Sequence, residues 1–181
     1  MTNYQLEELL DLLDSSRERL LVAIEPLPDQ ALLFKGVVDT WTIADVLSNL
    51  TAWEAEMVTG LLLIDQNKQP VNLLIALKDP QTFDQLRYAE NRGRDLDSIF
   101  ADFQQVRVQL EEWLEHFPAR VLNNPKRFTW FSGRSLADVI ATTTFKREAR
   151  FVTAIERFAH GWENGTLFSG QGNGSFNGTQ N

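Results

Sequence analysis

The sequence contains no cysteine, so disulfide bonds and thiolate metal ligands are excluded. It has only two histidines, His116 and His160, and each lies near the end of an expected helix, where a cation interacts favourably with the helix dipole. Neither belongs to a histidine pair of i, i+4 spacing or to a Glu-x-x-His motif, and the sequence therefore predicts no metal site. The longest apolar runs, 20–24 and 73–77, are far too short to span a membrane.

Charge and length narrow the class of protein further. The formal net charge of -8 argues against a nucleic-acid partner, which would require clustered Lys and Arg. The N-terminal segment carries Glu7 and Glu8 and has no basic region, so it does not resemble a signal peptide. We therefore expect a cytoplasmic protein of 181 residues, long enough for one hydrophobic core, with no membrane partner.

Apolar residues recur every three or four positions in four long segments, which is typical of amphipathic helices. These segments begin near Leu6, Thr42, Asp95 and Ser135, and the pairs Thr42–Asp45 and Ser135–Asp138 resemble helix-capping boxes. The pattern predicts an all-α four-helix bundle, with a last helix that runs without a break to about residue 159.

The remaining segments divide the chain. A connection over 70–81, with a helical turn at 73–77, and a short helix over 83–92 are expected in the long crossover between the second and third long helices. From about residue 163 the composition becomes rich in Gly and Asn. We predict one domain over 1–162 and a flexible tail over 163–181.

Three segments resemble a known family. Residues 41–54, in which Trp41 precedes a capped helix containing Asn49 and Trp53, resemble the second-helix signature of the DinB-like superfamily. Residues 128–151 are similar to its last-helix region, and 82–114 are similar to the ClbS/DfsB branch. The resemblance implies a DinB-like four-helix bundle with a short extra helix in the crossover.

In the DinB-like superfamily a divalent metal is often held by three histidines. By resemblance these positions are Asn49, Phe145 and Ala149 in this chain. Phenylalanine and alanine cannot bind a metal, and one asparagine would bind it weakly. The resemblance therefore predicts a degenerate metal triad, with neither a metal nor another cofactor.

Polar residues on two helices are the remaining candidates for a site. Asn49, Trp53 and Glu56 share one helix face and either line a pocket or form a satisfied core with Glu56 at its rim. The run 146–148 is read first as a solvated face, with Arg147 turned inward to pair with Glu56 as the alternative. Weak catalytic candidates are Glu56 and Glu148. Predicted ligand-binding residues are Asn49, Trp53, Tyr88, Asn91, Thr142 and Arg147.

Some ClbS-like proteins open an electrophilic cyclopropane with water to protect the producing cell. The resemblance therefore implies a metal-free bundle that binds a small metabolite, an electrophile included, in a pocket between helices. If the protein is an enzyme, we expect a metal-independent, hydrolase-like activity. The alternatives are a non-catalytic binding protein and a structural or interaction protein that forms a homodimer.

Overall fold

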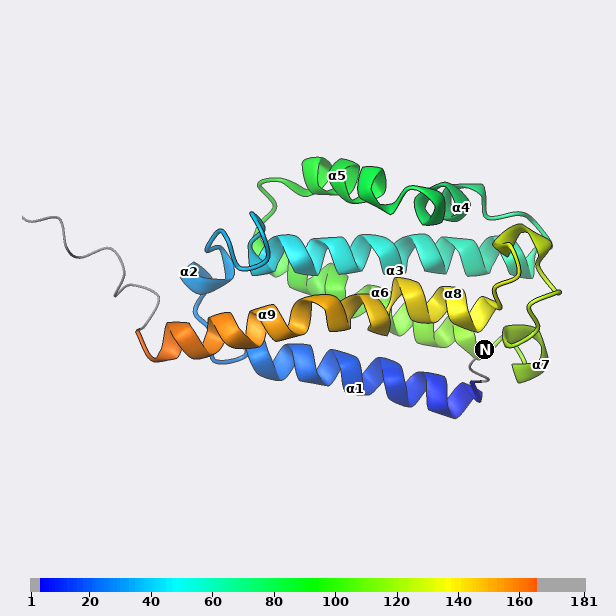
Figure 1. Cartoon of the computed structure of the whole chain (residues 1–181), viewed down its shortest axis with the longest axis horizontal. Coiled ribbons are helices and arrows are strands. Elements are labelled where there is room, and N and C mark those ends of the chain that lie inside the picture. The colour runs from blue at the N-terminus through cyan, green and yellow to red at the C-terminus, as the bar shows by residue number, and fades with distance from the viewer. Residues whose placement is uncertain (1–3, 166–181) are drawn as a thin grey trace, which may run out of the picture.

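The computed structural model describes residues 4–165, and the structured part of that range is built from helices (Figure 1). The prediction of an all-α bundle is therefore confirmed. Residues 166–181, most of the predicted tail, lie outside the described range. The elements are α1 (Leu6–Ile24), α2 (Asp29–Leu32), α3 (Ile43–Asp65), α4 (Val71–Lys78), α5 (Pro80–Asn91), α6 (Leu96–Leu114), α7 (Ala119–Leu122), a 3₁₀ turn (Thr129–Phe131), α8 (Leu136–Thr143) and α9 (Phe145–Glu163).

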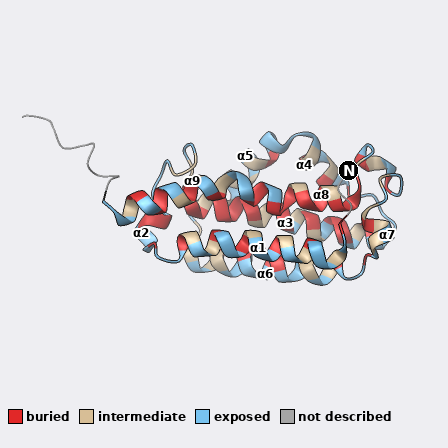
Figure 2. Ribbon diagram, turned by 60° about the horizontal axis from the view of Figure 1, so that its bottom comes forward, coloured by how far each residue is buried: buried red, intermediate tan, exposed pale blue. Residues whose placement is uncertain are grey.

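Four long rods form the bundle: α1, α3, α6, and the pair α8 and α9, which follow one another along one line (Figure 1). α3 packs along α6, and α1 packs along α9. Buried residues line the inner faces of these rods, whereas exposed residues line the outside (Figure 2). Within 4–165, no helix is long and apolar enough to cross a membrane.

Both predicted capping boxes are present. The Thr42 hydroxyl accepts a hydrogen bond from the Asp45 N–H at 2.9 Å, and the Asp45 carboxylate accepts one from the Thr42 N–H at 2.9 Å. Ser135 and Asp138 make the same reciprocal pair at the start of α8. These bonds satisfy backbone donors that a helix start leaves free, and they fix where α3 and α8 begin.

The last long helix is broken at Thr144, which corrects the prediction of an uninterrupted helix. Thr144 has a non-helical backbone with φ -119° and ψ -110°. The hydroxyls of Thr143 and Thr144 both donate to the carbonyl of Ile140, at 3.1 and 2.7 Å. Such side-chain bonds compete with the helical ladder and bend helices. α9 therefore starts a new register at Phe145.

The crossover contains two helices rather than one, because the expected turn at 73–77 extends to the eight residues of α4. α4 and α5 form an outer layer against α3 (Figure 1). Gly60 of α3 allows α4 to approach closely, since a Cβ there would lie 2.8 Å from Cδ2 of Leu73. The Asp79 carboxylate caps α5 by accepting a hydrogen bond from the Thr82 N–H at 3.1 Å.

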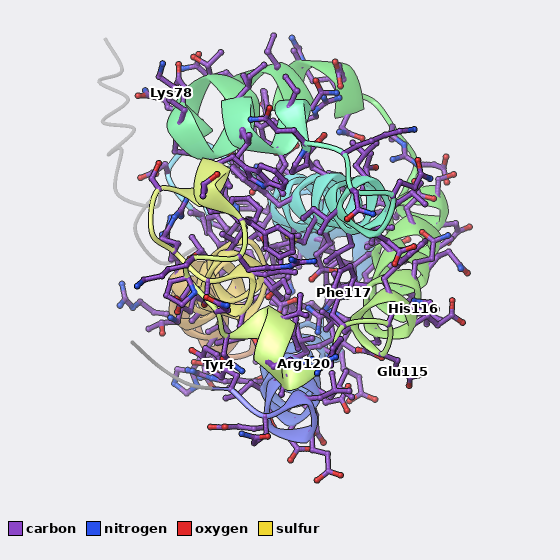
Figure 3. The ribbon with its side chains drawn as sticks, turned by 90° about the vertical axis from the view of Figure 1, so that its right-hand side faces the viewer. Tyr4, Lys78, Glu115, His116, Phe117 and Arg120 are labelled. Atoms are coloured by element: carbon purple, nitrogen blue, oxygen red, sulfur yellow. The ribbon has the colours of Figure 1, made fainter. Side chains whose placement is uncertain are left out.

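The N-terminal segment closes one end of the bundle, the end that faces the viewer in Figure 3. The Tyr4 N–H donates to the Asn123 side chain at 2.8 Å, and the Asn123 amide donates back to the Tyr4 carbonyl at 2.6 Å. The Tyr4 ring also meets the ring of Phe145 edge-on, with centroids 6.2 Å apart. Phe145 thus belongs to the apolar packing of this end.

Candidate functional site

Four buried charged residues meet in the interior, one from each long rod: Arg17 of α1, Glu54 of α3, Arg107 of α6 and Glu148 of α9. Their exposed fractions are only 7, 1, 5 and 0%, respectively. The ion-pair distances lie between 2.5 and 3.0 Å, and the two positive charges balance the two negative ones. We call these four residues the interior ion cluster.

The charged groups of this cluster make further hydrogen bonds with backbone carbonyls and with a serine hydroxyl. Arg17 donates to the carbonyl of Phe103 at 2.8 Å, and Arg107 donates to the carbonyl of Leu13 at 2.6 Å. The Ser16 hydroxyl donates to Glu148 at 2.6 Å. Burial alone would lower the pKa of Arg107, but Glu54 and Glu148 raise it above its ordinary value. Glu148 is therefore committed to structure, which argues against the catalytic role considered for it.

A second polar cluster lies between α3, α5 and α9. The Arg147 Nη2 donates to both carboxylate oxygens of Asp84 at 2.5 Å, and Arg147 Nε donates to the Asn49 side-chain oxygen at 3.0 Å. The Asn49 amide and the Trp53 indole N–H also donate to Asp84, at 2.9 and 2.7 Å. The Arg147 guanidinium lies 4.5 Å from the centre of the Trp53 ring. Three of the predicted ligand-binding residues are thus brought together.

This arrangement corrects two predictions about the last helix. The run 146–148 is not a solvated face, because only Lys146 is exposed, and Arg147 pairs with Asp84 rather than with Glu56. Phe145 and Ala149 lie two residues on either side of Arg147, roughly 200° around the helix from it. Ala149 is exposed, so the three proposed triad positions do not converge on Asn49.

A small pocket lies between α3, α4 and α5, with a volume of about 270 Å³. A second pocket of about 310 Å³ lies beside it along α3 and α5. Both are lined by Glu56 and Arg87. The exposed apolar side chains Ile75 and Leu86 line the first pocket, and Asn91 lines the second. The site therefore places Glu56 and Arg87 beside an apolar surface, with Asp79 in the first pocket and Glu90 in the second.

No side chain or backbone group of the described residues donates a hydrogen bond to Glu56. The Oε1 atom of Glu111 on α6 also has no hydrogen-bond partner, but Glu111 lines neither of the two pockets. Burial raises the pKa of the Glu56 carboxyl, and the nearby Arg87 charge partly opposes this shift. Arg87 itself pairs with Glu90 at 2.6 Å, and its guanidinium lies 5.1 Å from the centre of the Phe83 ring. A half-buried carboxylate without a partner is free to contact a ligand or a water molecule.

The other predicted ligand-binding residues are separated. Tyr88 stacks on Trp41, with ring centroids 5.8 Å apart and an interplanar angle of 7°. The Thr142 hydroxyl donates to the Asp138 carbonyl of its own helix at 2.7 Å. Asn91 is the member that lies beside Glu56 in a pocket, and its amide donates to the Arg87 carbonyl at 2.9 Å.

A larger pocket, about 660 Å³, is a groove along α1, α2 and α6. Its walls are apolar, as at Leu21 and Val22, or acidic, as at Glu18 and Glu25. Arg17 borders the groove but is already paired within the interior ion cluster. The groove is larger than the Glu56 pockets, but its acidic residues Glu18 and Glu25 are exposed to solvent, whereas Glu56 is half-buried. We therefore place the candidate site at Glu56.

No group of three or more His, Cys, Asp or Glu side chains in 4–165 is placed to hold a metal ion. The fold and the two polar clusters define an all-α protein in which four long helical segments surround a core that contains buried ion pairs. Residues 12–145 match the model of the DinB superfamily. The chain belongs to the DinB superfamily.

Two further comparisons bear on the identification. A crystal structure of an uncharacterised protein from Escherichia coli UTI89 is similar in fold, with a TM-score of 0.72 at 15% sequence identity. The match covers 88% of this chain and 95% of that chain. No curated protein matches this chain. The structural match shows the fold, and the superfamily assignment rests on the family model over residues 12–145.

Proposed function

We propose that this protein is a metal-free DinB-like bundle of the ClbS/DfsB type that binds a small electrophilic metabolite between α3, α4 and α5. The observation that carries the proposal is Glu56, an unpartnered, half-buried carboxylate with a raised pKa at the junction of two pockets. The exposed apolar residues Ile75 and Leu86 beside it favour an apolar ligand. A protective role in the cytoplasm follows from such chemistry.

Arg147 supports the metal-free character of the proposal. In the family resemblance, Asn49 marks one metal-ligand position, and in this chain the Arg147 guanidinium donates to it at 3.0 Å. A guanidinium keeps its positive charge at any physiological pH. The Asn49 side-chain oxygen is therefore engaged by a donor, and the nearby Asp84 carboxylate is paired with Arg147 rather than free to hold a metal.

Glu56 is suited to act as a general base towards a water molecule. The carboxylate would take one proton from water while the water oxygen bonds to the electrophilic carbon. The ring bond between that carbon and the departing ring atom breaks, and the departing atom receives the proton from the Glu56 carboxyl. The Arg87 charge, which lines both pockets, would stabilise the negative charge that develops on the departing atom.

A simple aryl epoxide is a practical probe, because its opening by water gives a diol 18 Da heavier, roughly the mass of the one water added. We expect the wild-type protein to accelerate diol formation and Glu56→Gln to lower the rate by about 10²–10⁴-fold. Glu112→Gln, which changes an exposed carboxylate on α6, is the matched control and should retain the wild-type rate. Equal rates for wild type and Glu56→Gln would refute the catalytic proposal.

A binding protein without catalysis is the second candidate. The favouring observation is that Arg87 is already paired with Glu90, which weakens its availability for a developing charge. Under this alternative the epoxide, or its diol, would bind to wild type and raise the melting temperature, while no diol accumulates above the uncatalysed rate. The same mass-spectrometric assay therefore separates the two functions.

A further inference from the structure

Asp84 is held by an unusually complete set of donors. One of its oxygens accepts hydrogen bonds from the Asn49 amide, the Trp53 indole and the Arg147 guanidinium, at 2.9, 2.7 and 2.5 Å. The second oxygen accepts another bond from Arg147. Convergent donors of this kind, with one guanidinium among them, are the usual way in which proteins recognise a carboxylate.

The donors and the acceptor belong to different layers of the molecule. Asn49, Trp53 and Arg147 lie on the bundle helices α3 and α9 and are 4, 2 and 5% exposed. Asp84 lies on α5 in the outer layer, and 24% of its side chain is exposed. The three donors are thus part of the core, whereas the carboxylate that they bind comes from the outer layer.

α5 is anchored by few buried groups. Phe83 is its only buried residue among twelve, and it packs on Trp53 with ring centroids 4.5 Å apart. Helices with few buried contacts open at low free-energy cost. If α5 moved away from the bundle, Asp84 would leave, and the buried donors of Asn49, Trp53 and Arg147 would lose their acceptor. Leaving buried donors without an acceptor costs free energy, unless another acceptor takes the place of Asp84.

We propose that Arg147, Asn49 and Trp53 form a carboxylate-binding site in which Asp84 is a built-in occupant that a free carboxylate ligand replaces. The site takes a small monocarboxylate or the carboxylate group of a larger ligand. This inference does not depend on catalysis by Glu56. It adds a carboxylate to the ligand features the protein recognises, because α5 also carries Phe83, Leu86 and Arg87 of the Glu56 pocket.

Chemical rescue tests the proposal directly. Asp84→Ala should lower the melting temperature, and 100 mM sodium formate should restore about 2–4 °C of the loss, beyond the effect of equal sodium chloride. Wild type should respond in the same direction by less than about 1 °C, because Asp84 competes at a high effective concentration and formate replaces it only in a fraction of the molecules. Asp102→Ala is the matched control, since Asp102 pairs with Arg94 at 2.6 Å on the surface and offers no buried receptor.

The indole N–H resonance of Trp53 gives a second readout that a general effect on stability would not move. It should shift in Asp84→Ala and return towards the wild-type position as formate is added, whereas Asp84→Ala combined with Arg147→Met should show no return. If Asp84→Ala does not fold, Asp84→Ser serves in its place, because its shorter hydroxyl side chain removes the charge and still leaves room for formate. Folded Asp84 variants that respond to formate no more than Asp102→Ala does would overturn the proposal.

Discussion

Replacing Glu54 by glutamine removes one of the two negative charges of the interior ion cluster. Arg17 and Arg107, which lie 2.9 and 2.5 Å from the Glu54 carboxylate, would then share Glu148 as their only acidic partner. Breaking a buried ion pair from one side costs about 3–5 kcal/mol, because an uncompensated charge stays buried. That is a large part of the roughly 5–15 kcal/mol by which a domain is stable.

Glu156→Gln is the matched control, since Glu156 pairs with Arg19 at 2.7 Å on the surface, where the two side chains are 37 and 53% exposed. Exposed pairs contribute about 0–1 kcal/mol. With a urea slope of about 2–3 kcal/mol/M, Glu54→Gln should lower the unfolding midpoint by roughly 1–2 M, and Glu156→Gln by less than about 0.5 M.

A double variant tests whether the cluster acts as a unit. Glu54→Gln combined with Arg107→Gln removes one charge of each sign and leaves Arg17 paired with Glu148 at 2.7 Å. Its loss of stability should be smaller than the sum of the two single losses by about 1–3 kcal/mol. Additive losses, or a Glu54→Gln midpoint equal to that of Glu156→Gln, would refute this reading of the cluster.

Three further predictions concern the capping residues of α3 and α8, the carboxyl group of Glu56, and the residues of α9 that face the bundle interior. Thr42→Ala and Ser135→Ala each remove a capping hydroxyl and should cost about 1 kcal/mol by urea unfolding. Folding raises the pKa of Glu56, so the stability of the wild-type protein falls as the pH rises through that pKa. At pH 7 the Glu56→Gln variant should therefore have a higher melting temperature than wild type. Below pH 4.5, the ordinary glutamate value, the two melting temperatures should converge. The variant Asn49→His, Phe145→His, Ala149→His should gain no thermal stability from nickel or zinc, because the exposed Ala149 does not face Asn49.

Helix-forming patterns made most of the fold predictable. Apolar spacing located the four rods, and the Thr42 and Ser135 motifs located two helix starts. The break at Thr144 was missed because local side-chain bonds of threonine, rather than a proline or glycine, interrupt the helix there. After that break Phe145 lies buried in the core, whereas Ala149 is exposed.

The charged interior has a signal in the sequence. Arg17 lies four residues after Leu13 and three before Leu20, a core position in the apolar stripe of α1. Glu54 and Arg107 interrupt the stripes of α3 and α6 in the same way. Two arginines and two acids at such positions on four helices are expected to pair when buried.

Asp84 could not have been predicted to join Asn49 and Arg147. Its segment has no buried stripe of its own, so sequence pattern does not fix how α5 lies on α3. The contact depends on where α4 and α5 dock, which is a tertiary property. Glu56 was identified from its helix face, but its lack of a partner became apparent only with the pocket around it.

Labelling by a small aryl epoxide tests the central role of Glu56 most directly, because an epoxide esterifies accessible carboxylates and peptide mass spectrometry locates the adducts. The chain has 25 Asp and Glu residues, Glu56 included, that compete for the probe. A pocket that binds the probe beside Glu56 should label this residue at least about tenfold faster than the exposed Glu112. Labelling of Glu56 at or below the rate of Glu112 would contradict the account.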